Sequence, residues 1–177
     1  LPPSTEEYAV TLAASLGEYF LRQGRAVGLI GWGATPTFLP PDRGGRQLNK
    51  MLEALAVFRA DGEFPLPALL QARTRHLPRG STLIVITPSV QQDVAVAMDE
   101  QARRGLRPIA VLLDTETFGG PEGTNRLAAA LTTARIPVYR VPFGADLEAA
   151  LSAAYVLSSP PLRSPAGAAA RPERSPI

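Results

Sequence analysis

The chain has 177 residues, which is enough for one domain with a buried core. Hydrophobic residues make up 45% and charged residues 19%, and a formal net charge of +2 without a dense Lys/Arg block argues against a nucleic-acid partner. The absence of cysteine excludes disulfides and thiolate metal sites, and no apolar run reaches the ~20 residues that span a bilayer. We therefore expect a cytoplasmic domain with no membrane segment in this chain.

The first half of the chain predicts a long helix, a buried strand and a short edge strand. Ser4 and Glu7 have the Ser-x-x-Glu spacing of a capping box, and apolar residues then recur at helical spacing up to Gly24. A buried strand is predicted over 25–32 (RAVGLIGW), and the proline-containing stretch 35–39 suits an edge strand in a hairpin. Two more helices are predicted, over about 44–62 and 65–77.

The second half alternates strands and helices. The clearest strand is 80–89 (GSTLIVITPS), and the elements predicted after it are a helix over 90–104, a strand over 106–113, a polar loop over 114–123, a helix over 127–134, a strand over 137–141 and a helix from Asp146 to about 157. This alternation predicts a doubly wound α/β domain over 1–157, with a mostly parallel sheet and helices on both faces. The remainder, 158–177, is rich in Pro, Ala, Ser and Arg and is predicted to be a disordered tail.

The order of the elements is unusual at its start. A doubly wound domain normally opens with a strand, whereas this chain opens with a helix. We therefore expect that the sheet lacks its first strand and that this strand lies upstream of Leu1.

Four blocks of the sequence resemble a known bacterial family. The carboxyl-terminal part of the domain of unknown function 58 family, a von Willebrand factor A-like domain, is similar in this order to STEEYAVTLAASLGEYFLRQGRAVGLIGWG, LPPDRGGRQLNKMLEALA, LPRGSTLIVITPS and RRGLRPIAVLLD. The resemblance covers 4–157. It implies a Rossmann-like sheet in which the missing first strand is central, between the strands at 25–32 and 80–89, so that these two strands are not hydrogen-bonded neighbours.

The resemblance also implies a partner and a location. Members of the family often have membrane helices further upstream, and their genes frequently accompany those of MoxR-type AAA+ ATPases. By this analogy the chain would be a non-catalytic interaction or scaffold module of a bacterial membrane-associated protein, tethered to the inner face of the membrane, with a MoxR-type ATPase as partner. Because a fold does not by itself imply a function, these statements are expectations.

A metal site is one function that the resemblance raises. Von Willebrand A domains hold magnesium with Asp-x-Ser-x-Ser after the first strand and with Thr and Asp from later loops. That first segment lies outside this chain, and the later Thr-Asp-Gly pattern corresponds to Thr87-Pro88-Ser89, so that Pro88 stands where an aspartate is expected. We expect no cofactor, because a magnesium site would need residues upstream of Leu1. Thr87 and Ser89 are expected to cap the following helix.

Three further features each have two interpretations. Asp114 follows the 106–113 strand, at the edge where α/β proteins bind ligands, but a lone acid there is commonly a turn residue. Trp32 suits either a partner contact or a wedge at the rim of the core. Arg43 and Arg46, at the start of the second helix, suit either an acidic partner segment or a solvated basic face.

The leading hypothesis is a non-enzymatic interaction module that uses loops at the carboxyl edge of the sheet. The alternative is a small-ligand-binding or hydrolytic domain that uses Asp114, Thr87 and Ser89 at the same edge. Ser89 lacks a Gly-x-Ser-x-Gly elbow and the chain has one histidine, His76, which both weaken the alternative. A deep polar pocket would favour the alternative, and a shallow, partly apolar surface would favour the module. The candidate partner-binding residues are Trp32, Arg43, Arg46, Thr87, Ser89 and Asp114.

Overall fold

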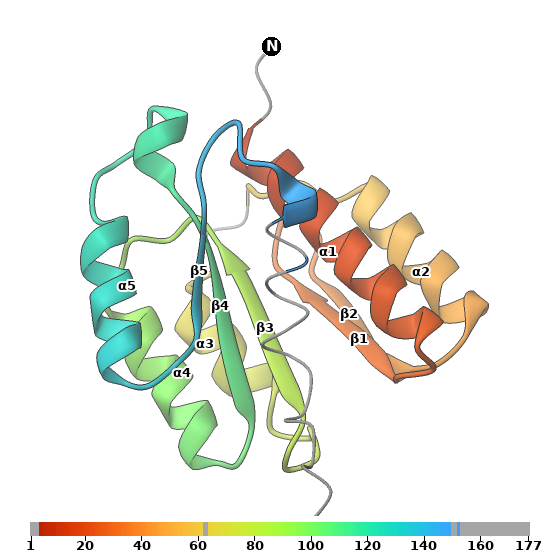
Figure 1. Ribbon diagram of the computed structural model, residues 1–177. Helices are drawn as coiled ribbons and strands as arrows, with labels where there is room; N and C mark the ends of the chain where they lie inside the picture. The colour runs from red at the N-terminus through yellow and green to blue at the C-terminus, as the bar shows by residue number, and fades with distance from the viewer. Residues whose placement is uncertain (1–3, 62–63, 150–151, 153–177) are drawn as a thin grey trace, which may run out of the picture.

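The computed structural model describes residues 4–61, 64–149 and 152, which form a mixed α/β fold with two sheets (Figure 1). The strands are β1 (Val27–Gly31), β2 (Thr37–Asp42), β3 (Thr82–Thr87), β4 (Arg107–Leu113) and β5 (Val138–Val141). The helices are α1 (Thr5–Arg22), α2 (Gly45–Ala56), α3 (Leu66–Arg73), α4 (Asp93–Arg103) and α5 (Thr124–Thr133), with a short 3-10 helix, η1, at Thr115–Phe118. Within the described ranges, no helix is both long and apolar enough to cross a membrane.

Helix α1 begins at the capping box that the sequence predicts. The Ser4 hydroxyl accepts a hydrogen bond from Glu7 N at 3.3 Å, and Glu7 Oε2 accepts one from Ser4 N at 2.8 Å. These two bonds satisfy backbone donors that have no partner inside the helix. The chain leaves the helix through Gly24, whose φ of 73° is readily adopted only without a side chain.

The larger sheet has the strand order β3-β4-β5, and both pairs are parallel. Ala110 and Leu112 of β4 point into a core formed with α4 and α5, with Leu70 of α3 at its side. Val111 and Leu113 point to the opposite face, where α1 covers them. This alternation is the two-residue period of a strand that is buried on both faces. A parallel sheet with helices on both faces is thus confirmed for these three strands.

The smaller sheet is an antiparallel hairpin of β1 and β2, with a bulge between Val27 and Leu29. Helix α2 is tied to this bulge by Gln47, a buried side chain whose amide donates to Val27 O at 2.7 Å and to Pro40 O at 3.0 Å. At Gly28 a Cβ atom would lie 2.7 Å from Leu39 O, so the close approach of β2 requires glycine. The predicted hairpin is confirmed, although its second strand continues through the prolines at 40 and 41 and does not end before them.

Strands β1 and β3 are not paired with each other. Among the described residues, β1 pairs with β2 and β3 pairs with β4. The expected absence of a ladder between the two is therefore observed. Both strands nevertheless run in the same direction. Helix α1 starts at the carboxyl edge of the larger sheet, because the Tyr8 hydroxyl near its beginning accepts a hydrogen bond from Gly144 N, after β5, at 2.9 Å. Strand β1 follows the far end of α1 and therefore runs back towards that edge, as β3 does.

Several predicted boundaries are wrong. The helix predicted from 90 begins at Asp93, and the strand predicted over 80–89 is confined to Thr82–Thr87. The second and third helices end earlier than predicted, at Ala56 and Arg73. Asp146 caps the residues after it as predicted, because its Oδ1 accepts from Glu148 N at 3.0 Å. The predicted end of that last helix and the predicted disordered tail, 158–177, lie outside the described residues.

Candidate functional site

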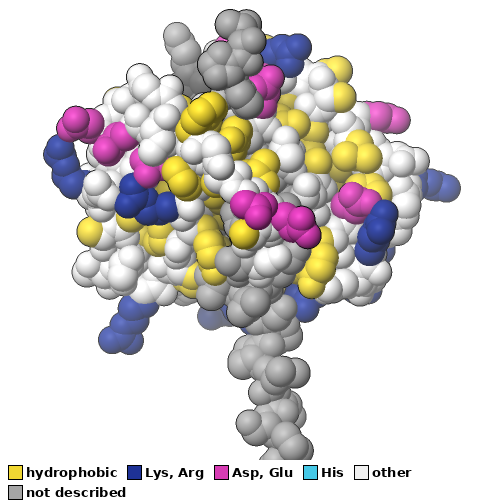
Figure 2. Space-filling model, turned by 45° about the horizontal axis from the view of Figure 1, so that its top comes forward, with side chains coloured by type: hydrophobic (Ala, Val, Ile, Leu, Met, Phe, Trp, Pro, Cys, Tyr) yellow, Lys and Arg dark blue, Asp and Glu magenta, His cyan; other side chains and the backbone are white. Residues whose placement is uncertain are grey.

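The candidate site is the carboxyl edge of the larger sheet, at the top of Figure 1, together with the amino end of α1. Four of the six predicted residues follow the carboxyl ends of strands: Trp32 after β1, Thr87 and Ser89 at the end of β3, and Asp114 after β4. Figure 2 brings this end forward and shows hydrophobic side chains spread over it, with acidic side chains among them. The candidate site is therefore mixed in character, with apolar and charged groups on one surface.

Thr87 and Ser89 form two successive turns and do not cap a helix. Ser89 N donates to Thr87 Oγ1 at 3.1 Å, and Gln91 N donates to Ser89 Oγ at 3.2 Å. Each hydroxyl serves a backbone N–H two residues ahead, which is the pattern of hydroxyl turns in loops. The N-cap position of α4 is Gln92, which makes no side-chain capping bond, so the predicted capping role is wrong. Each turn uses one acceptor site of its hydroxyl, and α4 begins only after the two turns, at Asp93.

Asp114 is buried and its carboxylate is paired with a residue that the sequence analysis did not select. Its Oδ2 accepts a short hydrogen bond from the Arg140 guanidinium of β5, and the same guanidinium donates to Asn125 Oδ1 at 2.6 Å. The second carboxylate oxygen, Oδ1, is buried without a hydrogen-bond partner among the described residues. A carboxylate held in this way links β4, β5 and α5, and one of its oxygens remains unsatisfied.

The glycine-rich loop after η1 is closed by a carboxylate. Glu116 Oε1 accepts from Gly123 N at 3.0 Å, at the residue before α5 begins. An acidic side chain thus occupies a backbone donor that a phosphate would use, and its charge opposes an anion there. Thr115 Oγ1 also donates to Pro121 O at 2.8 Å, which closes the loop from its other side. These contacts close the loop that the sequence predicts over 114–123.

Aromatic side chains from three distant segments meet at this edge. The rings of Tyr8 and Phe118 are 5.0 Å apart, and those of Phe118 and Phe143 are 5.4 Å apart, each in an edge-to-face arrangement. Phe143 remains 44% exposed. Trp32 is half-buried and its ring lies 4.4 Å from that of Phe64, which is 41% exposed. Trp32 therefore belongs to a partly exposed aromatic pair. Its packing on Phe64 suits a wedge at the rim of the core, and the partial exposure of the pair suits a partner contact.

Arg43 and Arg46 do not belong to the same site as the other four residues. Arg43 Nη1 donates to Gly24 O at 2.6 Å, just after α1 ends. The amino end of α1 is at the carboxyl edge of the sheet, and a helix of 18 residues is about 27 Å long. The two arginines are both exposed, and they lie at the opposite end of the molecule from Asp114. One of them holds the α1–β1 turn to the start of α2.

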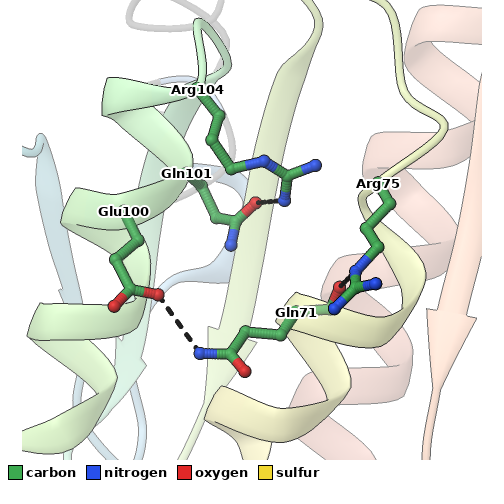
Figure 3. A pocket seen from close by; sticks show the side chains of 5 residues that line it. All are labelled: Gln71, Arg75, Glu100, Gln101 and Arg104. Atoms are coloured by element: carbon green, nitrogen blue, oxygen red, sulfur yellow. Dashed lines mark hydrogen bonds between the residues drawn. The ribbon is translucent and has the colours of Figure 1, made fainter.

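A polar cavity of about 400 Å³ lies between α3 and α4, on the face of the sheet away from α1 (Figure 3). Gln101 is fully buried in its wall, and its Oε1 accepts from Thr74 Oγ1 at 2.6 Å and from Arg104 Nη1 at 3.0 Å. Because Arg104 can only donate, this bond fixes the orientation of the Gln101 amide, whose Nε2 has no hydrogen-bond partner among the described residues. One hydrogen bond between the lining residues crosses the two helices, from Gln71 Nε2 to Glu100 Oε2 at 3.2 Å. The residues that line it are Gln71, Arg75, Glu100, Gln101 and Arg104.

Comparison of the sequence with protein-family models and with curated proteins finds no match. In the described part of the chain, no group of three or more His, Cys, Asp or Glu side chains is arranged to hold a metal ion. The site residues that the sequence analysis missed are Arg140, Phe118 and Phe143. For Arg140 the signal was present, because the predicted strand at 137–141 ends one residue after it, at the same edge as Asp114.

Proposed function

We propose that this chain is a non-catalytic protein–protein interaction module with a von Willebrand factor A-like architecture, and that loops at the carboxyl edge of its sheet contact the partner. The observation that carries the proposal is a contrast at this edge between polar groups that bond within the fold and an aromatic ring that remains exposed. The hydroxyls of Thr87 and Ser89 and the carboxylate of Asp114 are engaged by the fold itself, whereas Phe143 presents an exposed ring. Exposed aromatic rings supported by packed neighbours are typical anchors of protein interfaces.

The partner class in this proposal rests on the resemblance to the domain of unknown function 58 family. A MoxR-type AAA+ ATPase is the partner that the resemblance implies, and the inner face of a bacterial membrane is the implied location. In the same way, the completion of the sheet by a first central strand is part of the proposed architecture. Among the described strands, β1 and β3 each have one edge without a ladder, which supports that part of the proposal.

The alternative function, a small-ligand-binding or hydrolytic domain, is favoured by one observation. Asp114 Oδ1 is buried at the ligand-binding edge of an α/β sheet and has no partner among the described residues. Against it stands the Arg140 guanidinium, which holds the other oxygen of the carboxylate. A general base must also be within reach of the proton that it removes, and no hydrogen bond joins the Asp114 carboxylate to a hydroxyl group among the described residues.

The test compares two exposed apolar residues on different surfaces. Phe143→Ser removes the exposed ring at the carboxyl edge, and Val96→Ser removes a side chain that is 62% exposed on α4. Calorimetry would measure the affinity of each variant for a MoxR-type ATPase encoded in the same genome. We expect roughly tenfold weaker binding for Phe143→Ser, as for an interface anchor, and unchanged binding for Val96→Ser. Equal affinity of both variants and the native chain would contradict the proposed surface.

A further inference from the structure

The polar cavity between α3 and α4 is separate from the candidate site at the carboxyl edge. Helix α4 begins at that edge, whereas the cavity lies beside its other end, where Arg104 is the cap residue. The cavity volume of about 400 Å³ is large enough for a small molecule. Each lining residue carries a charge or an amide, and four of the five are exposed, so the cavity opens to solvent. Its walls therefore suit a polar ligand.

Gln101, in the wall of the cavity, has a donor without an acceptor. The side chain is fully buried, and its Oε1 accepts hydrogen bonds from Thr74 and Arg104. Its Nε2 has no partner among the described residues. In Figure 3 this nitrogen points away from Arg104, towards the space between Glu100 and Gln71. A buried amide N–H group without an acceptor is uncommon in folded proteins, and a ligand oxygen or a water molecule would satisfy it.

The two arginines of the cavity have no carboxylate partner. Arg75 Nε donates to Gln71 O at 3.2 Å, and Arg104 Nη1 donates to Gln101 Oε1 at 3.0 Å. Neither guanidinium group forms an ion pair in the part of the chain that the structure describes. Each one keeps further N–H groups for a ligand, and the planar guanidinium matches the two oxygens of a carboxylate.

Glu100 lies across the same space from the arginines. Figure 3 shows the guanidinium groups of Arg75 and Arg104 on one side, and the Glu100 carboxylate with the Gln71 amide on the other. Glu100 Oε2 accepts from Gln71 Nε2, whereas its Oε1 accepts no hydrogen bond from a described residue. Two guanidinium groups against one carboxylate leave the cavity with an excess positive charge. The cavity therefore offers two sites for anionic groups and one for a cationic group.

From these observations we propose that the cavity binds an acidic α-amino acid, such as glutamate or aspartate. The two carboxylates of the ligand bond to Arg75 and Arg104, and its ammonium group bonds to Glu100 Oε1. The single net negative charge of the ligand then matches the excess positive charge of the cavity. An oxygen of the carboxylate at Arg104 also supplies the acceptor that Gln101 Nε2 lacks. Because that nitrogen is itself covered, one of the exposed side chains around it shifts when the ligand binds.

The experiment titrates the complete 177-residue chain with L-glutamate and, separately, with glutarate at the same ionic strength. Glutarate has the same two carboxylates without the ammonium group. The measurement is the NMR resonance of the Gln101 side-chain amide, which reports binding at the wall of the cavity. We expect this resonance to shift with glutamate, and we expect glutamate to bind more tightly than glutarate. The constant ionic strength keeps the screening of surface charge equal in both titrations.

Three variants assign the contacts. Arg75→Gln removes a guanidinium group and should weaken the binding of both ligands roughly tenfold. Glu100→Gln should weaken glutamate and strengthen glutarate, because the carboxylate that it removes attracts an ammonium group and repels a carboxylate. Arg75 and Glu100 are both exposed, so neither substitution disturbs the core. The matched control is Arg103→Gln, which removes an exposed charge beside Arg104 and outside the cavity and should change neither affinity.

Four results would overturn this assignment. A Glu100→Gln variant whose affinities for glutamate and glutarate change in the same direction would show that the ammonium group is not recognised. Inorganic phosphate that binds as tightly as glutamate would reduce the cavity to a general anion site. Equal losses for Arg75→Gln and Arg103→Gln would mean that surface charge alone attracts the ligand. A Gln101 resonance that no probe shifts would show that the cavity does not bind them. The proposed partner surface at the carboxyl edge is unaffected by each of these results.

Discussion

The three-stranded sheet has two edges of opposite character. Strand β5 ends the sheet with a short segment between two prolines, and its Arg140 is bound to Asp114 and Asn125. Strand β3 ends it with six uncharged residues, of which Leu83, Ile84 and Ile86 are half-buried. The short length, the flanking prolines and the charge of the first edge discourage further strand pairing, and the second edge has none of these features. The comparison shows that the two edges of the described sheet differ in the features that discourage further strand pairing.

The largest expected effect tests the difference between the middle of the sheet and its open edge. Leu112 of β4 is fully buried, so Leu112→Ala should lower the free energy of unfolding by about 3–5 kcal/mol through lost transfer energy and a cavity. Ile84→Ala at the open edge should cost only about 1–2 kcal/mol, because its side chain is already half in water. Urea unfolding of both variants at low protein concentration is the measurement. Equal costs would show that the β3 edge is covered in solution.

A smaller effect is expected at the closed edge. Arg140→Met leaves the buried Asp114 carboxylate without its cation and should lower the free energy of unfolding by about 2–3 kcal/mol. The matched control is Arg103→Met, which breaks the exposed pair with Asp99 on α4 and should cost about 0.5 kcal/mol or less. Thermal and urea unfolding measure both variants. A loss at Arg140 no larger than at Arg103 would mean that this ion pair does not fasten β5 to the sheet.

The sequence predicts best those features that depend on neighbours along the chain. The capping box of Ser4 and Glu7 and the cap at Asp146 involve residues two or three positions apart, and both are present in the structure. The alternation of strands and helices is likewise a local pattern, and it correctly indicates a parallel sheet with helices on both faces. The absence of a ladder between β1 and β3 in the described part of the chain agrees with the expectation drawn from the family resemblance.

The candidate site was harder to predict because it depends on contacts between distant residues. The Asp114–Arg140 pair joins residues 26 positions apart, and it forms only because β4 and β5 are neighbours. The aromatic group of Tyr8, Phe118 and Phe143 comes from three distant segments. The spacing of apolar residues along the chain does not predict that these segments come together. The helix predicted from 90 starts late for a different reason, since hydroxyl turns compete with helix formation for the same backbone donors.

The smallest expected effect concerns a single backbone donor on the open edge. The register of β3 directs Thr82 N–H away from β4, so Thr82→Pro removes a donor that has no partner in the described ladder. We expect it to lower the free energy of unfolding by less than about 1 kcal/mol, part of which is the lost bond from Arg107 to the Thr82 hydroxyl. Thr82→Ala isolates that part.

A matched proline substitution at the next residue provides the comparison that gives this small effect its meaning. Leu83→Pro removes an N–H that faces β4 and should cost about 3 kcal/mol or more, because a ladder bond is lost and the ring disturbs a paired strand. Urea unfolding of the three variants under one condition gives the ratio directly. If Thr82→Pro costs as much as Leu83→Pro, the β3 edge is already hydrogen-bonded in solution, and the contrast between an open and a closed edge fails. If only Leu83→Pro is costly, the Thr82 N–H has no hydrogen-bond partner in the folded protein, as expected for an open edge.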